Sequence, residues 1–191
     1  GQQECERIAK AATNLLQAGV TCELVSAGST PTALADIEHT GIYELRAGVY
    51  ATFDCVMAGL GVCETTDIAL SVLTSVIGHQ GDKNWVIVDA GWMALSRDKG
   101  TASQQQDCGY GLVCDEHGKL LDGWYVSATN QEHGIISHRD NLTPPESVFG
   151  YGRLLRILPI HACATAAQYS KYHVIGDDGN ITAIWSRVNG W

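Results

Sequence analysis

Two residues with metal-binding chemistry stand close together near the end of the chain, within residues 158–163 (LPIHAC). The imidazole of His161 and the thiolate of Cys163 are both suitable ligands for Zn²⁺, and one residue separates them. A closed structural zinc site needs four protein ligands, and the sequence has no second close cluster of Cys and His. The spacing alone leaves two interpretations open: an open metal site completed by water or substrate, or a buried histidine beside a buried cysteine.

A second candidate site is the small-residue loop Gly28, Ser29 and Thr30, which follows an apolar stretch and precedes Pro31. Proline suits the first turn of a helix because its missing N–H would have no partner there, and Ser29 or Thr30 can cap that helix. The backbone N–H groups at such a start favour an anion, usually a phosphate. A plain capped turn is the alternative interpretation.

A similar loop, Gly48, Val49 and Tyr50, follows the next predicted strand. In parallel α/β folds the carboxyl ends of the strands meet at one edge of the sheet, so we expect the two loops to lie near each other. The N–H groups of Val49 and Tyr50 would then reach the same oxyanion. An ordinary bend at Gly48 is the alternative.

The elements that must position these loops alternate at the start of the chain. Apolar spacing predicts a helix over 4–18, a strand over 20–27, a short helix over 32–38 and a second strand over 43–53. This order is typical of a parallel α/β unit. Two strands and two helices cannot cover both faces of a parallel sheet, so we expect another segment or another chain to complete it.

After residue 65 the pattern changes to short strands separated by Gly, Asp and Asn turns. Strands are predicted over 68–77, 85–89, 111–114, 124–127, 134–137, 154–159 and 181–188, with one helix over 162–172. This spacing indicates a β-rich second domain, and we place the boundary between residues 62 and 63.

Composition limits the classes of partner. The chain has 191 residues, 45% of them apolar, and a net charge of −9, which makes nucleic acid and anionic membranes poor partners. No apolar run reaches the roughly 18 residues of a membrane helix. The seven cysteines are odd in number and include no C-x-x-C pair, which favours reduced thiols in a cytoplasmic protein over a disulfide framework.

Five motifs occur in order along the chain: 26–32 (SAGSTPT), 44–50 (ELRAGVY), 88–91 (VDAG) with 94–96 (ALS), 132–134 (EHG) and 159–163 (PIHAC). Together they resemble the D-serine dehydratase and D-threonine aldolase family, and residues 185–191 also look like the family's end. The resemblance implies a pyridoxal-phosphate enzyme with an alanine-racemase-like, TIM-type barrel. Residues 1–62 would be the last strand–helix units of that barrel, and residues 63–191 would be the D-serine dehydratase-like β domain.

The resemblance also implies roles for the candidate residues. Pyridoxal 5′-phosphate would be held through its phosphate, and a divalent metal, zinc, would be bound by His161 and Cys163. The phosphate-binding residues would be Gly28, Ser29, Thr30, Gly48, Val49 and Tyr50. Family members that resemble dehydratases have His-x-Cys, whereas aldolases tend to have Asp in the second position. Cys163 therefore favours dehydration of D-serine to pyruvate and ammonia over retro-aldol cleavage of D-threonine-type substrates.

One departure from the family concerns its Schiff-base lysine, which lies on the first strand of the barrel. None of the lysines here ends an apolar strand before the phosphate loops: they are Lys10, Lys83, Lys99, Lys119 and Lys171. We therefore expect no catalytic residue in this chain, a missing amino-terminal barrel half that carries the lysine, and no turnover of a D-amino acid by the chain alone. The family suggests a homodimer. A non-catalytic module that binds a phosphate-bearing ligand or a partner chain is the alternative.

Overall fold

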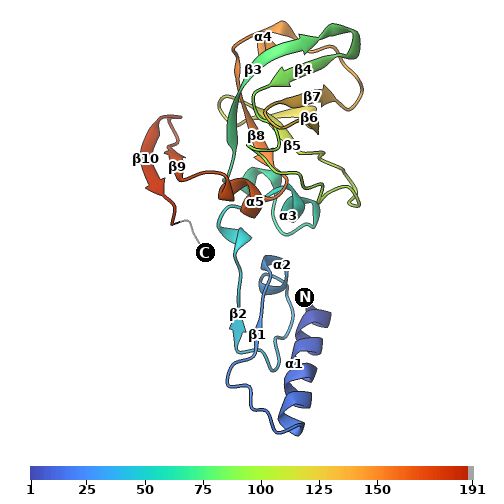
Figure 1. Ribbon diagram of the computed structural model, residues 1–191, viewed down its shortest axis with the longest axis vertical. Coiled ribbons are helices and arrows are strands. Elements are labelled where there is room, and N and C mark those ends of the chain that lie inside the picture. Colours follow the sequence, from blue (N-terminus) through green and yellow to red (C-terminus); the bar gives the residue numbers. More distant parts are fainter. Residues whose placement is uncertain (189–191) are drawn as a thin grey trace.

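The computed structural model describes residues 1–188, so the last three residues of the predicted family-like ending lie outside the described part. Figure 1 shows a β-barrel at one end of the molecule and a slender α/β unit at the other. The helices α3 (Cys55–Gly59) and α5 (Ala162–Ala167) lie between these two parts (Figure 1). Among the described residues no helix is both long and apolar enough to cross a membrane.

The amino-terminal unit has the predicted order of elements. It consists of α1 (Gln2–Gln17), β1 (Ser26–Ala27), α2 (Thr30–Ala33) and β2 (Glu44–Leu45). The two strands are parallel. They are much shorter than the predicted 20–27 and 43–53, because each strand pairs only with the other over two residues. The helix predicted over 32–38 is likewise wrong in its bounds, and residues Val49–Ala51 form a 3₁₀ turn instead of strand.

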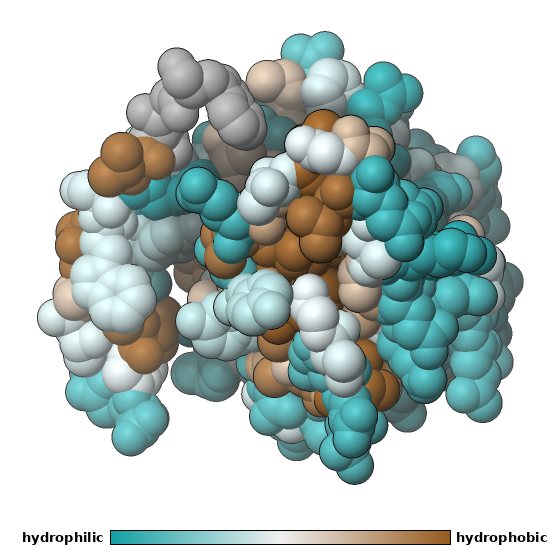
Figure 2. All heavy atoms as spheres, turned by 90° about the horizontal axis from the view of Figure 1, so that it is seen from below, coloured by the Kyte–Doolittle hydropathy of each residue, from teal (hydrophilic) through white to brown (hydrophobic). Residues whose placement is uncertain are grey.

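Large apolar side chains remain exposed on this unit. Figure 2, viewed from the end of the molecule that carries the unit, shows apolar residues gathered across the middle of the face. The exposed large apolar residues of the unit are Leu15, Leu16, Val20, Leu24, Leu34, Tyr43 and Leu45. A contiguous apolar surface of this kind marks an interaction site more often than free surface.

The second part of the chain is a closed, six-stranded antiparallel barrel with the order β3-β4-β7-β6-β5-β8. This confirms the predicted β-rich part. The strands are β3 (Val72–Gln80), β4 (Trp85–Val88), β5 (Gly111–Asp115), β6 (Leu120–Thr129), β7 (Gly134–His138) and β8 (Leu154–Pro159). Four of them, β4 to β7, begin and end within a few residues of the predicted bounds, and β8 matches its predicted bounds. The strand predicted over 68–77 is shifted toward its carboxyl end in β3.

The barrel core follows from the period of two along each strand. Alternate residues point inward, and those at the centre of the barrel are fully buried: Val86, Val88, Val126, Ile136 and Ile157. The short helix α4 (Glu146–Phe149) adds Phe149, whose ring centroid lies 4.4 Å from that of Trp124. A filled interior of this size leaves no room for a ligand inside the barrel, so a site must lie at its end or outside it.

The helix predicted over 162–172 ends early, at Ala167, and the strand β9 (Lys171–Ile175) was missed. The strand β9 forms an antiparallel hairpin with β10 (Ile181–Ser186), and this hairpin stands beside the barrel in Figure 1. The helix α3 was not predicted, because five residues are too few to show a helical period. Two further 3₁₀ turns, Thr65–Asp67 and Gly81–Lys83, flank β3.

Candidate functional site

His161 lies where the chain leaves the barrel. The strand β8 ends at Pro159, Ile160 is 1% exposed, and His161 is the N-cap residue of α5, so its backbone is extended while its carbonyl accepts the Thr165 N–H at 3.1 Å. The apolar end of β8 thus anchors this segment in the core, while the side chains of His161 and Cys163, which follow β8, reach the surface. Cys163 is exposed, so the interpretation of a buried thiol at this position is wrong.

The imidazole of His161 is held by a carboxylate. Its Nδ1 lies 2.5 Å from Oδ2 of Asp98, and each side chain is about half exposed. Because the carboxylate accepts a hydrogen bond from Nδ1–H, the other ring nitrogen, Nε2, carries the free lone pair. Metal-binding histidines usually donate their other ring N–H to a carboxylate or carbonyl in this way. The hydrogen bond to Asp98 therefore orients the His161 ring so that Nε2 is the atom available to bind a metal.

A second carboxylate fixes the backbone between the two candidate ligands. Asp54, which is 2% exposed, is the N-cap of α3, where its Oδ1 accepts the Met57 N–H at 3.0 Å. Its Oδ2 accepts the N–H of Ala162 at 2.9 Å. Asp54 therefore joins the starts of α3 and α5 and sets the position of the residue between His161 and Cys163. Sequence reasoning missed both aspartates, because the pairings are distant in the chain.

His161 and Cys163 line the same cavity, of about 480 Å³. Its other lining residues include Asp54, Asp98 and Lys99, and also Val49 from the second predicted phosphate loop. Within residues 1–188, no three His, Cys, Asp or Glu side chains lie close enough together to hold one metal ion. A metal on His161 and Cys163 would thus have an open coordination sphere, which suits a catalytic site better than a structural one.

The two predicted phosphate loops lie side by side, as expected. The parallel pairing of β1 and β2 brings their ends together, and the N–H of Tyr50 donates to the hydroxyl of Thr30 at 3.1 Å. The guanidinium of Arg46 lies beside Gly28 and donates to the hydroxyl of Ser26. Arg46 brings a positive charge to this edge, which suits an anionic group. That these loops bind a phosphate stays a prediction.

The hydroxyl of Ser29 is committed to the helix start. Its oxygen accepts the N–H of Thr32 at 3.2 Å, and the hydroxyl of Thr32 in turn donates to the carboxylate of Glu4 on α1. The N-cap at Ser29 and the Pro31 helix start are confirmed. Only the backbone of Ser29, and not this capping lone pair, is therefore available to a ligand.

We expect Ser29→Ala to lower the free energy of unfolding by about 1 kcal/mol, because the Thr32 N–H loses its acceptor. Urea denaturation measures the change. Thr13→Ala on α1 is a matched control, since the hydroxyl of Thr13 donates only to an exposed backbone carbonyl. Equal stabilities of the two variants would contradict the capping role.

Comparisons with known proteins agree with this arrangement. Residues 69–175 match the family model described as a putative serine dehydratase domain. The chain is 53% identical over 184 residues to D-threo-3-hydroxyaspartate dehydratase of Delftia sp. (strain HT23), covering 95% of this chain and 48% of that protein. It is 31% identical over 182 residues to D-serine dehydratase of Dictyostelium discoideum, covering 91% of this chain and 44% of that protein.

Solved structures give the same result. A cysteine-to-alanine mutant of D-threo-3-hydroxyaspartate dehydratase in the metal-free form superposes on the whole chain with a TM-score of 0.88 and 50% identity, and the chain covers 50% of it. The chain thus shares the fold of the matching half of that dehydratase. The chain belongs to the putative serine dehydratase domain family, and it spans about half the length of the curated relatives that it matches.

Proposed function

We propose that this chain is the carboxyl-terminal part of a pyridoxal-phosphate and metal-dependent lyase that dehydrates D-β-hydroxy amino acids. The observation that carries the proposal is the pair His161 and Cys163 on one cavity, with His161 oriented by Asp98. In support, histidine-to-alanine and cysteine-to-alanine mutants of D-threo-3-hydroxyaspartate dehydratase have been solved, and the two replaced residues are two positions apart in that enzyme, as they are here.

The residues of this chain have separate tasks in the proposal. His161 and Cys163 hold the zinc ion, Asp98 orients the imidazole, and the loops at Gly28–Thr30 and Gly48–Tyr50 hold the cofactor phosphate beside Arg46. When bound, the cofactor supplies an electron sink and the metal supplies a Lewis acid for the departing β-hydroxyl group. The six residues of the two loops are Gly28, Ser29, Thr30, Gly48, Val49 and Tyr50.

We propose a substrate with a second carboxylate, as in D-threo-3-hydroxyaspartate, over D-serine. Identity to the hydroxyaspartate dehydratase is 53%, against 31% to the D-serine dehydratase. Lys99 supports this choice, because it is the one lysine or arginine among the described residues that line the cavity with His161. An ammonium there would pair with the substrate's β-carboxylate, a group that D-serine lacks.

Completion of the enzyme needs a further barrel half that carries the cofactor-binding lysine. The relatives are about twice as long as the region they share with this chain, and the amino-terminal unit presents exposed apolar residues that such a half would cover. We further propose that the enzyme is a homodimer. We also propose that it is cytoplasmic, because all seven cysteines are free thiols.

The test compares the chain with the longer protein that contains it. Three substrates, D-threo-3-hydroxyaspartate, D-serine and D-threonine, are supplied with and without a chelator. We expect oxaloacetate and ammonia from the first substrate, loss of that activity on chelation, and no turnover by the 191-residue chain. Glycine plus an aldehyde would instead show retro-aldol cleavage. A metal-free longer protein without activity on all three would support a non-catalytic binding module.

We expect Asp98→Asn to weaken zinc binding about 10- to 100-fold, because the imidazole loses the carboxylate that fixes its orientation. Competition with a zinc-binding dye measures the dissociation constant. Asp140→Asn is the control, since this exposed aspartate lies 4.0 Å from a different histidine, His138. Unchanged zinc affinity in Asp98→Asn would contradict the positioning role.

A further inference from the structure

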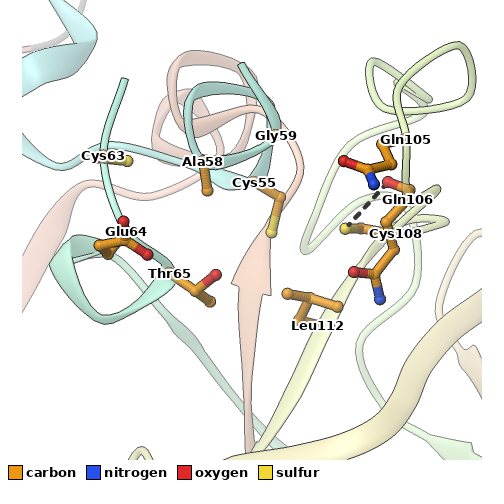
Figure 3. Close-up of a pocket in the computed structure, with 10 residues that line it drawn as sticks. All are labelled: Cys55, Ala58, Gly59, Cys63, Glu64, Thr65, Gln105, Gln106, Cys108 and Leu112. Atoms are coloured by element: carbon orange, nitrogen blue, oxygen red, sulfur yellow. Dashed lines mark hydrogen bonds between the residues drawn. The ribbon is translucent and has the colours of Figure 1, made fainter. Parts of the chain in front are cut away.

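A second cavity, of about 230 Å³, lies beside α3 and shares no lining residue with the first. Cys55 and Cys108 both line it. Figure 3 shows their sulfur atoms directed into the same space, one from α3 and the other from the loop that precedes β5. The two side chains also belong to one buried apolar cluster. Two nucleophilic groups therefore meet at a cavity that the proposed lyase site does not use.

The loop that carries Cys108 is held firmly. The N–H of Cys108 donates to the hydroxyl of Thr101 at 2.9 Å, and that hydroxyl donates to the carboxylate of Asp107 at 3.0 Å. Thr101 is fully buried. On the other side, the thiol of Cys55 lies 3.5 Å from the carbonyl oxygen of Leu158 on β8. Both sulfur atoms are thus presented by fixed backbone.

We propose that Cys55 and Cys108 form a dithiol site that hydrogen peroxide oxidises to a disulfide. Cys108 is the attacking thiol and Cys55 the resolving thiol. The site is independent of the proposed lyase function, since it needs neither the metal nor the cofactor.

The electrostatics separate the two roles. A hydrogen bond from Cys55 lowers the pKa of Cys108 to about 7, and the positive charge of Arg139 acts in the same direction, while burial and Asp107 oppose them. The same hydrogen bond, together with burial and the nearby Asp54, raises the pKa of Cys55. About half of Cys108 is therefore thiolate at pH 7, and the thiolate is the form that attacks.

The chemistry balances in two steps. The Cys108 thiolate attacks one oxygen of the peroxide, the O–O bond breaks, and a protonated sulfenic acid and hydroxide result. The Cys55 sulfur then attacks the Cys108 sulfur, the S–O bond breaks, and water leaves with the proton from Cys55. The hydroxide takes up the proton that Cys108 released when it ionised, so one peroxide is reduced to two waters and two thiols are oxidised to one disulfide.

The size of the cavity determines which oxidants can reach the two sulfur atoms. Cys55 is 1% exposed and Cys108 is 8% exposed, so a reagent reaches either sulfur only through the cavity. The cavity of about 230 Å³ has room for hydrogen peroxide, a molecule little larger than water. A bulky disulfide such as oxidised glutathione would need the walls to move, so we expect it to react more slowly.

The test treats the full chain with hydrogen peroxide at pH 7, blocks the remaining thiols and maps the peptides by mass spectrometry. We expect a peptide pair linked through Cys55 and Cys108, and a rate that rises with pH up to about 7 and then levels. Cys114 is the internal control, because burial raises its pKa to about 11 and it should stay reduced. Cys63 lines the same cavity and should also stay reduced, since its pKa is raised.

The variant Cys55→Ala tests whether the hydrogen bond from Cys55, and not only access through the cavity, makes Cys108 reactive. In Cys55→Ala, Cys108 loses its main stabilising donor, so its thiolate fraction at pH 7 falls about 50-fold while its intrinsic nucleophilicity rises about tenfold. We expect oxidation of Cys108 to slow about fivefold and to stop at the sulfenic acid, which dimedone traps. Cys22→Ala, at an exposed cysteine, should change neither result. Absence of the Cys55–Cys108 link in the folded wild-type chain, or linkage of Cys63 to Cys108 instead, would overturn the proposal.

Discussion

Replacing His161 with alanine is expected to reduce the zinc content of the purified chain from about one ion per chain to background. His161 and Cys163 are the two ligand side chains on the larger cavity that the proposal assigns to the metal, so the variant leaves one thiolate and solvent to hold the ion. Loss of a directly bound ligand should cost more than the roughly 10- to 100-fold caused by loss of a supporting residue. Plasma mass spectrometry after gel filtration measures the content.

A matched control is available on the barrel. His117 is also a solvent-facing histidine next to a carboxylate, with its Nε2 3.5 Å from Glu116, but it lies in the turn between β5 and β6. His117→Ala should keep the full zinc content. Retention of zinc in His161→Ala, with the chain folded by circular dichroism, would contradict the metal site and with it the lyase proposal.

The strands of the barrel could be predicted from the sequence because their signal is local. Alternating burial along β4 and the apolar run of β8 follow from a period of two, which a short window displays. The lengths predicted for the amino-terminal strands were too great, because composition does not show whether a partner strand is present. Residues 20–25 have strand-like composition, but a strand exists only where a partner strand pairs with it, and the described chain supplies one short partner.

The candidate site was only partly predictable, because most of its contacts join residues that are distant in the chain. His161 and Cys163 are neighbours in sequence, so their spacing is visible there. The contacts that support them are not: Asp98 reaches His161 across 63 residues, and Asp54 reaches Ala162 across 108. Distant pairings such as these depend on the closure of the barrel, which composition and periodicity do not encode.

Replacement of Asp54 by alanine is the substitution expected to cost the most stability at the site. Both of its carboxylate oxygens accept backbone N–H groups, from Met57 and from Ala162, and the side chain is 2% exposed. Asp54→Ala leaves two buried donors without an acceptor, at about 1–3 kcal/mol each, so we expect the free energy of unfolding to fall by about 2–6 kcal/mol. Urea denaturation followed by circular dichroism measures it.

The same substitution should also act on the metal, since Asp54 holds the residue between His161 and Cys163. We expect zinc affinity to fall about 10- to 100-fold at temperatures where the variant remains folded. Asp67→Ala is the matched control: Asp67 accepts one exposed backbone N–H, from Glu64, so its loss should cost only about 0.5–1 kcal/mol and leave zinc binding unchanged. An Asp54→Ala variant that keeps both wild-type stability and wild-type zinc affinity would show that the two helix starts are positioned by other contacts.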